Sequence, residues 1–379
     1  MRNAHIQSWR KYLLSLSAIA ALGLASSAKA GLMFEFRENQ VTANIDSDNY
    51  DMAIGGGQAH VAYQNGGSIY YTSRGLHSAQ WSSPILIGSG TTPSIAAGPG
   101  GAVHIAYQNG GNIFESASGN GFSSNVVSPG SYGSIGVSAN GTRHLLIEGN
   151  FDGDGYVEIG HRSNGGAGWS PVAILHDGAY ADGSGNYFGQ SSLAARADGS
   201  FAYALEQQVW GGKASWSNKY PSAIIPGGPG ASMGVDWNIG SNISRNAIAD
   251  GPDGVGFVFS TGGTVYANVM MGGDWVGFLP IGTGSQASAD MSIGLASAFS
   301  DGGKIMLFDG LVTTQIEVDS VGLIGSNPII GGDGTDLYVL YRDGSGSLDL
   351  VTTVVTPEPG TVATILTGAG VLLLRRRSR

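Results

Sequence analysis

The sequence predicts an all-β fold, a seven-bladed β-propeller built from four-stranded antiparallel blades. Three observations support this prediction. Glycine accounts for 64 of the 379 residues, no cysteine is present and only 12% of the residues are charged, which fits neither a coiled coil nor a highly charged disordered chain. The middle of the chain repeats itself with a mean period near 46 residues. Turn signals recur about every 8–12 residues within each repeat, which leaves little room for helices.

The first thirty residues have the three parts of a secretory signal peptide. A basic start with Arg2 and Arg10 precedes an apolar stretch, and small residues stand at Ala28 and Ala30. We expect signal peptidase to cut after Ala30, so that residues 1–30 are removed. A retained membrane anchor is the weaker interpretation, because the apolar stretch falls short of the ~20 residues that a spanning helix needs.

The body between the two ends is acidic. Residues 31–356 contain ten Lys or Arg against twenty-seven Asp or Glu, a net charge of −17, while the whole chain carries −10. This balance argues against a nucleic-acid partner, because binding one requires a basic footprint. An exported chain without cysteines has no disulfides, so its stability must come from a large core or from a closed topology.

The repeat is clearest in its first two copies. AHVAYQNGGSIYY (59–71) and VHIAYQNGGNIFE (103–115) match at eight of thirteen positions, forty-four residues apart. Weaker copies follow at residues 143–161, 200–216, 255–269, 304–318 and 336–351. Seven units with a period of ~40–50 residues are typical of propeller blades. Because the fourth to sixth units are degenerate, six or eight blades remain alternatives.

Each unit has the pattern of four short strands. It opens with an apolar strand such as SIAA (94–97) and passes a Gly/Asp turn into the second strand. Asn65-Gly66 and Asn109-Gly110 then predict tight hairpins, because both central residues of such turns need φ > 0. A third strand follows, and an aromatic residue often opens the fourth.

Two sets of residues recur at equivalent positions in different units, and we interpret both as structural. The tryptophans are expected to pack between neighbouring sheets, and the histidines to serve within their own blades rather than to form a metal ring. These residues are Trp81, Trp169 and Trp275, and His60, His104 and His144.

The seventh unit lacks a fourth strand. Its last strand, LDLVTTVV (348–355), runs straight into Thr356 and Pro357, whereas LMFEFRENQVTAN (32–44) is a strand-like segment before the first unit. We expect residues 32–44 to pair with the last blade and close the ring, which removes an exposed sheet edge.

A candidate metal site lies in NFDGDGYVE (150–158). Oxygen ligands at alternate residues and a Gly for the bend are the pattern of a calcium loop. The predicted ligands are the side chains of Asn150, Asp152, Asp154 and Glu158 and a backbone carbonyl near Tyr156. The pattern resembles the calcium-binding hairpins of integrin-type propellers, where an acidic ligand sits at the ninth loop position. It departs from an EF-hand, and an ordinary Asp/Gly turn is the alternative.

Two inter-blade connections are longer than the others and carry aromatic and acidic residues. Long insertions on a rigid scaffold often bind ligands, and aromatic faces beside carboxylates suit sugar rings. The predicted ligand-binding residues are Tyr180, Asp182 and Tyr187 in the first connection and Asp236 and Trp237 in the second.

An enzymatic function has weaker support. SNGGAGW (163–169) is similar to the Asp-box of sialidase-like propellers but lacks its Asp. The region after Ala30 and before the C-terminal arginines contains seven Arg and no Arg-Ile-Pro, whereas a sialidase needs three convergent arginines. We therefore expect a non-catalytic scaffold that binds glycan or protein partners, with a secreted glycoside hydrolase of sialidase-like type as the alternative.

The C-terminal residues carry a second transport pattern. Pro357, Glu358 and Pro359 interrupt regular structure, and residues 361–374 form an apolar segment. A basic cluster follows, made of Arg375, Arg376 and Arg377, which the positive-inside rule would hold on the cytoplasmic side of a membrane. A plain C-terminal membrane anchor is the weaker alternative, because so short an apolar segment spans a bilayer poorly.

This tail resembles the PEP-CTERM family of sorting signals, which combine Pro-Glu-Pro, a hydrophobic segment and a terminal Arg cluster. The resemblance covers only residues 356–379. It implies transient membrane insertion, recognition and cleavage by an exosortase near Pro-Glu-Pro, and release to the cell surface or exopolysaccharide matrix of a Gram-negative bacterium. The predicted organisation is thus a signal peptide at 1–30, a propeller at 31–355 and a sorting tail at 356–379.

Overall fold

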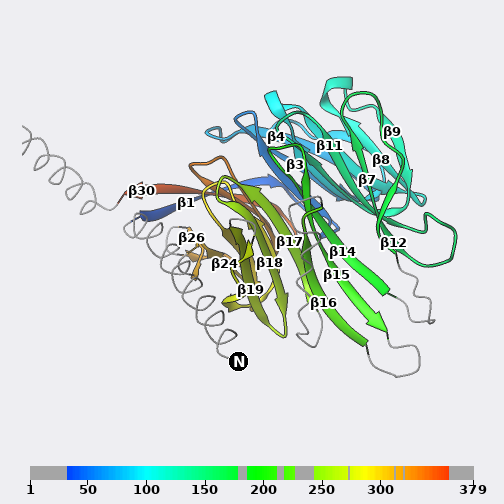
Figure 1. Cartoon of the computed structure of the whole chain (residues 1–379). Helices are drawn as coiled ribbons and strands as arrows, with labels where there is room; N and C mark the ends of the chain where they lie inside the picture. The colour runs from blue at the N-terminus through cyan, green and yellow to red at the C-terminus, as the bar shows by residue number, and fades with distance from the viewer. Residues whose placement is uncertain are drawn as a thin grey trace, which may run out of the picture.

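The fold is all-β, as predicted (Figure 1). The computed structural model describes residues 32–177, 186–210, 217–226, 243–271, 274–310, 313–318 and 321–357. Among these residues the only helices are the single 3-10 turns η1 (Pro99–Gly101) and η2 (Ser118–Asn120). Within the same ranges, no helix has the length and apolar character needed to cross a bilayer.

Seven antiparallel sheets follow one another along the chain, and we number them blades 1 to 7. Blade 1 contains β2 (Tyr50–Gly55), β3 (Gln58–Asn65), β4 (Ser68–Gly75) and β5 (Ile85–Ser89). Blade 2 contains β6 (Thr91–Ala97), β7 (Val103–Asn109), β8 (Asn112–Ala117) and β9 (Ser124–Pro129). Blade 3 contains β10 (Ser131–Val137), β11 (Arg143–Gly149), β12 (Glu158–Asn164) and β13 (Ala173–His176).

The remaining blades repeat this order with small variations. The described strands of blade 4 are β14 (Asn186–Ala195), β15 (Phe201–Trp210) and β16 (Ser217–Ile224). Blade 5 contains β17 (Ile243–Gly251), β18 (Gly254–Thr261), β19 (Thr264–Met271), β20 (Asp274–Trp275) and β21 (Leu279–Thr283), the last two both pairing with β19. Blade 6 contains β22 (Ser285–Asp290), β23 (Ala296–Asp301), β24 (Lys304–Phe308) and β25 (Thr313–Gln315), and the short pair β26 (Glu317–Val318) and β27 (Val321–Gly322) follows. Blade 7 contains β28 (Gly325–Gly332), β29 (Leu337–Asp343), β30 (Leu348–Pro357) and β1 (Leu32–Thr42).

The N-terminal strand closes the ring, which confirms the prediction for this segment. β1 runs antiparallel to β30 in blade 7, from Leu32 opposite Pro357 to Thr42 opposite Leu348 (Figure 1). The inner strands also contact one another in a complete cycle, β2–β6–β10–β14–β17–β22–β28 and back to β2. The number of blades is therefore seven, and six or eight are excluded.

Hydrophobic packing fills every interface between blades. The buried apolar residues form seven clusters, one for each pair of neighbouring blades. The cluster between blades 7 and 1 joins Tyr338 and Leu350 to Tyr50 and Val61, so the first and last sheets pack like any other pair. Because burial of apolar surface is the main stabilising term in folding, this circle of clusters stabilises a chain that has no disulfides.

The tight hairpins differ by one residue from the prediction. Asn65 pairs with Ser68, so the two central residues of the turn are Gly66 and Gly67, with φ of 58° and 71°. The equivalent turn of blade 2 likewise centres on Gly110-Gly111. Asn65-Gly66 and Asn109-Gly110 were therefore assigned one position too early. Two glycines adopt φ > 0 without steric cost, which favours them over Asn-Gly at the central positions.

The recurrent tryptophans pack at blade interfaces. Trp81 and Trp169 each lie against the hydrophobic cluster of an interface, beneath a guanidinium group. Arg74 lies 5.2 Å from the ring centre of Trp81, and Arg143 lies 5.3 Å from that of Trp169. Trp275 instead packs edge-on against Phe257. These contacts are structural, as the repeat predicts.

The recurrent histidines bond within their own blades. His60 Nδ1 lies 2.8 Å from the Tyr71 hydroxyl, and His104 Nδ1 lies 2.9 Å from Glu115 Oε1. His144 Nδ1 lies 3.2 Å from His161 Nε2, and burial, with the charge of His144, lowers the pKa of His161 to about 4. Each histidine thus links the second strand of its blade to the third.

Candidate functional site

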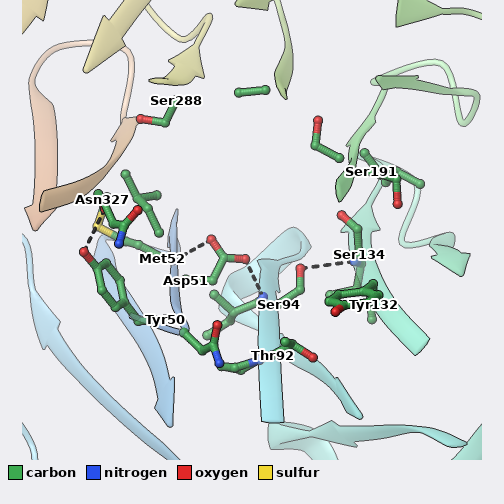
Figure 2. A pocket seen from close by; sticks show the side chains of 18 of the residues that line it. Tyr50, Asp51, Met52, Thr92, Ser94, Tyr132, Ser134, Ser191, Ser288 and Asn327 are labelled. Carbon is green, nitrogen blue, oxygen red and sulfur yellow. Dashed lines mark hydrogen bonds between the residues drawn. The ribbon is translucent and has the colours of Figure 1, made fainter. Parts of the chain in front are cut away.

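A cavity of about 600 Å³ lies where the seven inner strands converge. Its lining residues come from β2, β6, β10, β14, β17, β22 and β28, one strand from each blade. A cavity to which every blade contributes must lie on the axis of the ring. We call it the central cavity, and Figure 2 shows part of its wall.

The inner strands carry β-bulges where they line the central cavity. Four non-glycine residues there hold a left-handed backbone conformation: Thr92, Tyr132, Gln286 and Asn327, with φ between 48° and 57°. Each of them falls at a register shift between its inner strand and the second strand of the blade. Such conformations are costly for side chains with a Cβ, and they cluster at functional sites.

A set of side-chain hydrogen bonds joins successive inner strands around the cavity. Asp51 Oδ2 accepts a hydrogen bond from the backbone N–H of Ile95, at 2.9 Å. Ser94 Oγ accepts one from Ile135 N at 3.2 Å, as Figure 2 shows. On the other side, Ser288 Oγ accepts one from Ile330 N at 3.0 Å and Gln286 Oε1 one from Asn327 N at 3.1 Å. These bonds fix the cavity wall, because each bridges two blades.

Each described residue that lines the central cavity is either acidic or uncharged. None of the described residues that line the central cavity is Lys, Arg or His, and its two acids are Asp48 and Asp51. Asp48 Oδ1 forms an ion pair with Arg342 Nη1 at 2.8 Å, and Asp51 accepts hydrogen bonds from the backbone N–H groups of Met52 and Ile95. Both carboxylates therefore already have partners in the fold.

The rest of the polar lining consists of hydroxyl and amide groups. The buried hydroxyl oxygens of Thr92, Ser191 and Ser192 make no hydrogen bond in the structure. Buried polar atoms without a partner are uncommon and are often explained by a ligand or ordered water. Beside them, Tyr132 is 52% exposed and offers an aromatic face at the wall (Figure 2). This combination suits a ligand with both hydroxyl groups and apolar C–H faces.

One buried acid lies directly behind the wall. Glu148, in β11, is 4% exposed, and its Oε1 has no hydrogen-bond partner. Burial raises the pKa of Glu148 to about 7, and a hydrogen bond from the main chain of Ser191 offsets only part of that effect. Glu148 therefore keeps its proton to a higher pH than an exposed glutamate does.

Most of the predicted ligand-binding residues lie outside the described ranges. These are Tyr180, Asp182, Asp236 and Trp237. Tyr187 is part of β14, where its backbone pairs with that of Gln208. The sequence did not point to the central cavity. A comparison of the inner strands, such as TTPSI (91–95) and SYGSI (131–135), shows the repeated serine that lines it.

The predicted calcium loop connects β11 to β12, and the structure brings its three acidic residues together. Carboxylate oxygens of Asp152, Asp154 and Glu158 lie within 4.8 Å of one another, together with one from Asp177. Asn150 Oδ1 instead accepts a hydrogen bond from Gly153 N at 2.7 Å. Tyr156, near which a backbone carbonyl is the fifth predicted ligand, has a side chain that is 42% exposed.

Sequence reasoning missed Asp177. It follows β13 and lies nineteen residues after Glu158, so no local spacing connects it to the loop. Only the antiparallel path of blade 3 brings the end of β13 back beside the β11–β12 connection. We call Asp152, Asp154, Glu158 and Asp177 the acidic cluster.

The residues of the predicted sorting signal are largely outside the described ranges. Pro357 is the last residue of β30, and Glu358, Pro359 and the Arg375–Arg377 cluster lie beyond it. Residues 1–31 are likewise outside the described ranges. The two transport signals remain predictions from the sequence.

Comparison with solved structures supports the propeller architecture. An ulvan lyase, a polysaccharide lyase, aligns with a TM-score of 0.52 at 12% identity, over 84% of this chain and 95% of the lyase. The α-L-arabinofuranosidase of Fusarium graminearum aligns with a TM-score of 0.47 at 12% identity, over 86% of this chain and 97% of the enzyme. No protein-family model and no curated protein matches the sequence. At such low identity the likeness to the lyase shows a shared fold alone.

Proposed function

We propose that the chain is an exported, non-catalytic propeller that binds a neutral glycan in the central cavity. The observation that carries this proposal is the composition of the cavity wall. Hydroxyl and amide side chains from successive blades surround the cavity, an exposed tyrosine stands beside them, and no described lining residue is basic. Sugars present hydroxyl groups for hydrogen bonding and C–H faces for stacking on aromatic rings.

The charge of the protein favours a neutral ligand over an anionic one. Asp48 and Asp51 line the cavity, and the body of the chain carries a net charge of −17. A polysaccharide that bears carboxylate or sulfate groups would meet like charges there, with no arginine or lysine among the described lining residues to pair with. A neutral chain of hexoses or pentoses meets no such repulsion.

The two acids that line the cavity already have hydrogen-bond or ion-pair partners, which favours glycan binding over hydrolysis. Hydrolysis of a glycosidic bond uses a pair of carboxyl groups, one of them free to give a proton to the leaving oxygen. Asp48 is paired with Arg342, and Asp51 accepts two backbone hydrogen bonds. The alternative, a secreted glycoside hydrolase, requires Asp48 or Asp51 to leave its partner, or the buried Glu148 to reach the cavity.

The two transport signals support export to the cell surface or to an exopolysaccharide matrix. Their residues fit signal peptidase at Ala30 and an exosortase near Pro357-Glu358-Pro359. Partners at the destination are then extracellular polysaccharide or surface proteins.

The intact mass of the protein recovered from its native host tests whether both ends are processed. A mass that includes Arg375–Arg377 contradicts processing of the tail.

Affinity electrophoresis tests the glycan proposal. We expect gels containing a neutral polysaccharide such as dextran, laminarin or xylan to retard the protein, and gels containing alginate to leave its mobility unchanged. Tyr132→Ala should weaken binding about fivefold or more, because an aromatic face that stacks on a sugar contributes about 1 kcal/mol or more.

The matched control is Tyr156→Ala, which removes another exposed tyrosine that does not line the cavity. It should bind as the unmodified protein does. Equal loss in both variants, or retardation by alginate alone, contradicts the proposal. Release of new reducing ends or of unsaturated sugars during incubation would show that the protein is an enzyme instead.

A further inference from the structure

The acidic cluster brings four carboxylates together from two separate parts of blade 3. Asp152 and Asp154 lie in the β11–β12 connection, Glu158 is the first residue of β12, and Asp177 follows β13. One oxygen of each lies within 4.8 Å of the others. Within the described ranges, no Lys or Arg forms an ion pair with Asp152, Asp154 or Glu158. Four like charges at this spacing repel one another unless a cation lies among them.

Glu158 provides an independent indication of a ligand. Its side chain is fully buried, at 0% exposure, and its Oε1 has no hydrogen-bond partner. A buried carboxylate normally satisfies both oxygens, because an unpaired charge away from water is costly. Glu158 Oε1 is thus an unsatisfied acceptor within the acidic cluster.

One oxygen of each carboxylate in the loop accepts a hydrogen bond from the backbone. Asp152 Oδ1 accepts a hydrogen bond from Asp154 N, and Asp154 Oδ1 accepts one from Tyr156 N, both at 2.9 Å. Glu158 Oε2 accepts one from Phe151 N. One oxygen of each of these three side chains therefore holds the loop in shape, and each carboxylate has a second oxygen besides.

We propose that the acidic cluster binds one calcium ion, with Asp177 as a ligand from outside the loop. The donors are all carboxylate oxygens, which favours a hard divalent cation over zinc or copper, whose sites usually include His or Cys. Calcium fits better than magnesium, because it accepts six to eight oxygen ligands in flexible geometry and loses its water more readily. The ion ties the β11–β12 connection to the end of β13, across the outer half of blade 3. This inference is independent of the glycan proposal.

Isothermal titration calorimetry on the purified full chain, stripped of metal with a chelator, tests the site. We expect one calcium ion to bind per chain and magnesium to bind more weakly. Calcium should also raise the melting temperature, because it binds the folded state and not the unfolded chain. Asp177→Asn should weaken calcium binding at least tenfold, and Glu158→Gln should do the same or more.

Asp253→Asn is the matched control. It removes the same charge from an exposed hairpin in blade 5, and it should bind calcium as the unmodified chain does. Absence of both binding heat and a melting shift in the unmodified chain overturns the proposal. Unchanged calcium affinity in Asp177→Asn would show that Asp177 is not a ligand. Equal weakening of calcium binding in Asp253→Asn would show that the net charge of the protein, and not the site, causes the loss. Since Asp177→Asn alters only an exposed side chain, it tests the site even if Glu158→Gln fails to fold.

Discussion

Thr92 shows how the central cavity depends on single residues. It holds a φ of 48° at a β-bulge, although a β-branched side chain tolerates this conformation poorly. Such a residue costs about 1–3 kcal/mol, and a glycine would avoid the cost. Tyr132, Gln286 and Asn327 have the same conformation at equivalent places in their blades. The fold therefore keeps side chains at positions where glycine would be more stable, which fits a role for them in the cavity.

Glu148 gives a prediction on pH dependence. Its pKa rises from 4.5 in the unfolded chain to about 7 in the fold. As the pH increases through this interval the unfolded state loses its proton first, so the folded state becomes less stable, and the loss is complete above about pH 7. Glu148→Gln removes this loss. We compare the free energy of unfolding of the variant with that of the unmodified protein at each pH. We expect this difference to be about 2 kcal/mol more favourable to the variant at pH 8 than at pH 5.

Urea unfolding at the two pH values measures this difference. An equal effect of Glu148→Gln at pH 5 and pH 8 would show that the carboxyl group is not protonated in the folded protein.

Residue-level properties of this kind were not predictable from the sequence. Glu148 is one of many acids along the chain, and only its burial behind Ser191 distinguishes it.

Among the elements, β1 has the largest effect on the architecture. It supplies the fourth strand of blade 7, and Val41 and Ile45, at and just beyond its end, are buried in the cluster between blades 7 and 1. A chain that begins at residue 46 loses this strand and leaves β30 with an open edge, which invites aggregation. We expect it to show no cooperative melting transition by circular dichroism.

The matched control for this truncation begins at residue 31. It lacks only the predicted signal peptide and keeps β1 complete. Its melting transition should match that of the processed protein. A cooperative transition at an unchanged temperature in the shorter chain would mean that β1 does not hold the ring closed.

The elements that the sequence predicted well are those with local patterns. Short apolar strands and Gly-Gly turns repeat in each unit, and the missing fourth strand of the last unit predicted the pairing of β1 with β30. The bulges of the inner strands and the position of Asp177 were not predictable in this way. They depend on how distant strands meet in space, and no local spacing encodes that.

At the scale of the whole molecule, ring closure explains both stability and the site. Seven interfaces bury seven apolar clusters, and the seven inner strands enclose one cavity on the axis. The periodic sequence predicted the ring, but it directed attention to the long connections around Tyr180 and Trp237 rather than to the axis. Each blade contributes only a few residues to the cavity, so a polar wall without a described basic residue emerges only when all seven blades are assembled.

The crystal structure of the protein with a neutral oligosaccharide tests the account most directly. The ligand should be a fragment of whichever polysaccharide retards the protein in the affinity gel. We predict an intact sugar chain in the central cavity, with one ring against Tyr132 and hydroxyl groups within hydrogen-bond distance of polar side chains that line the cavity. A sugar bound only on the outer surface of the ring, or a cleaved product in the cavity, would contradict it.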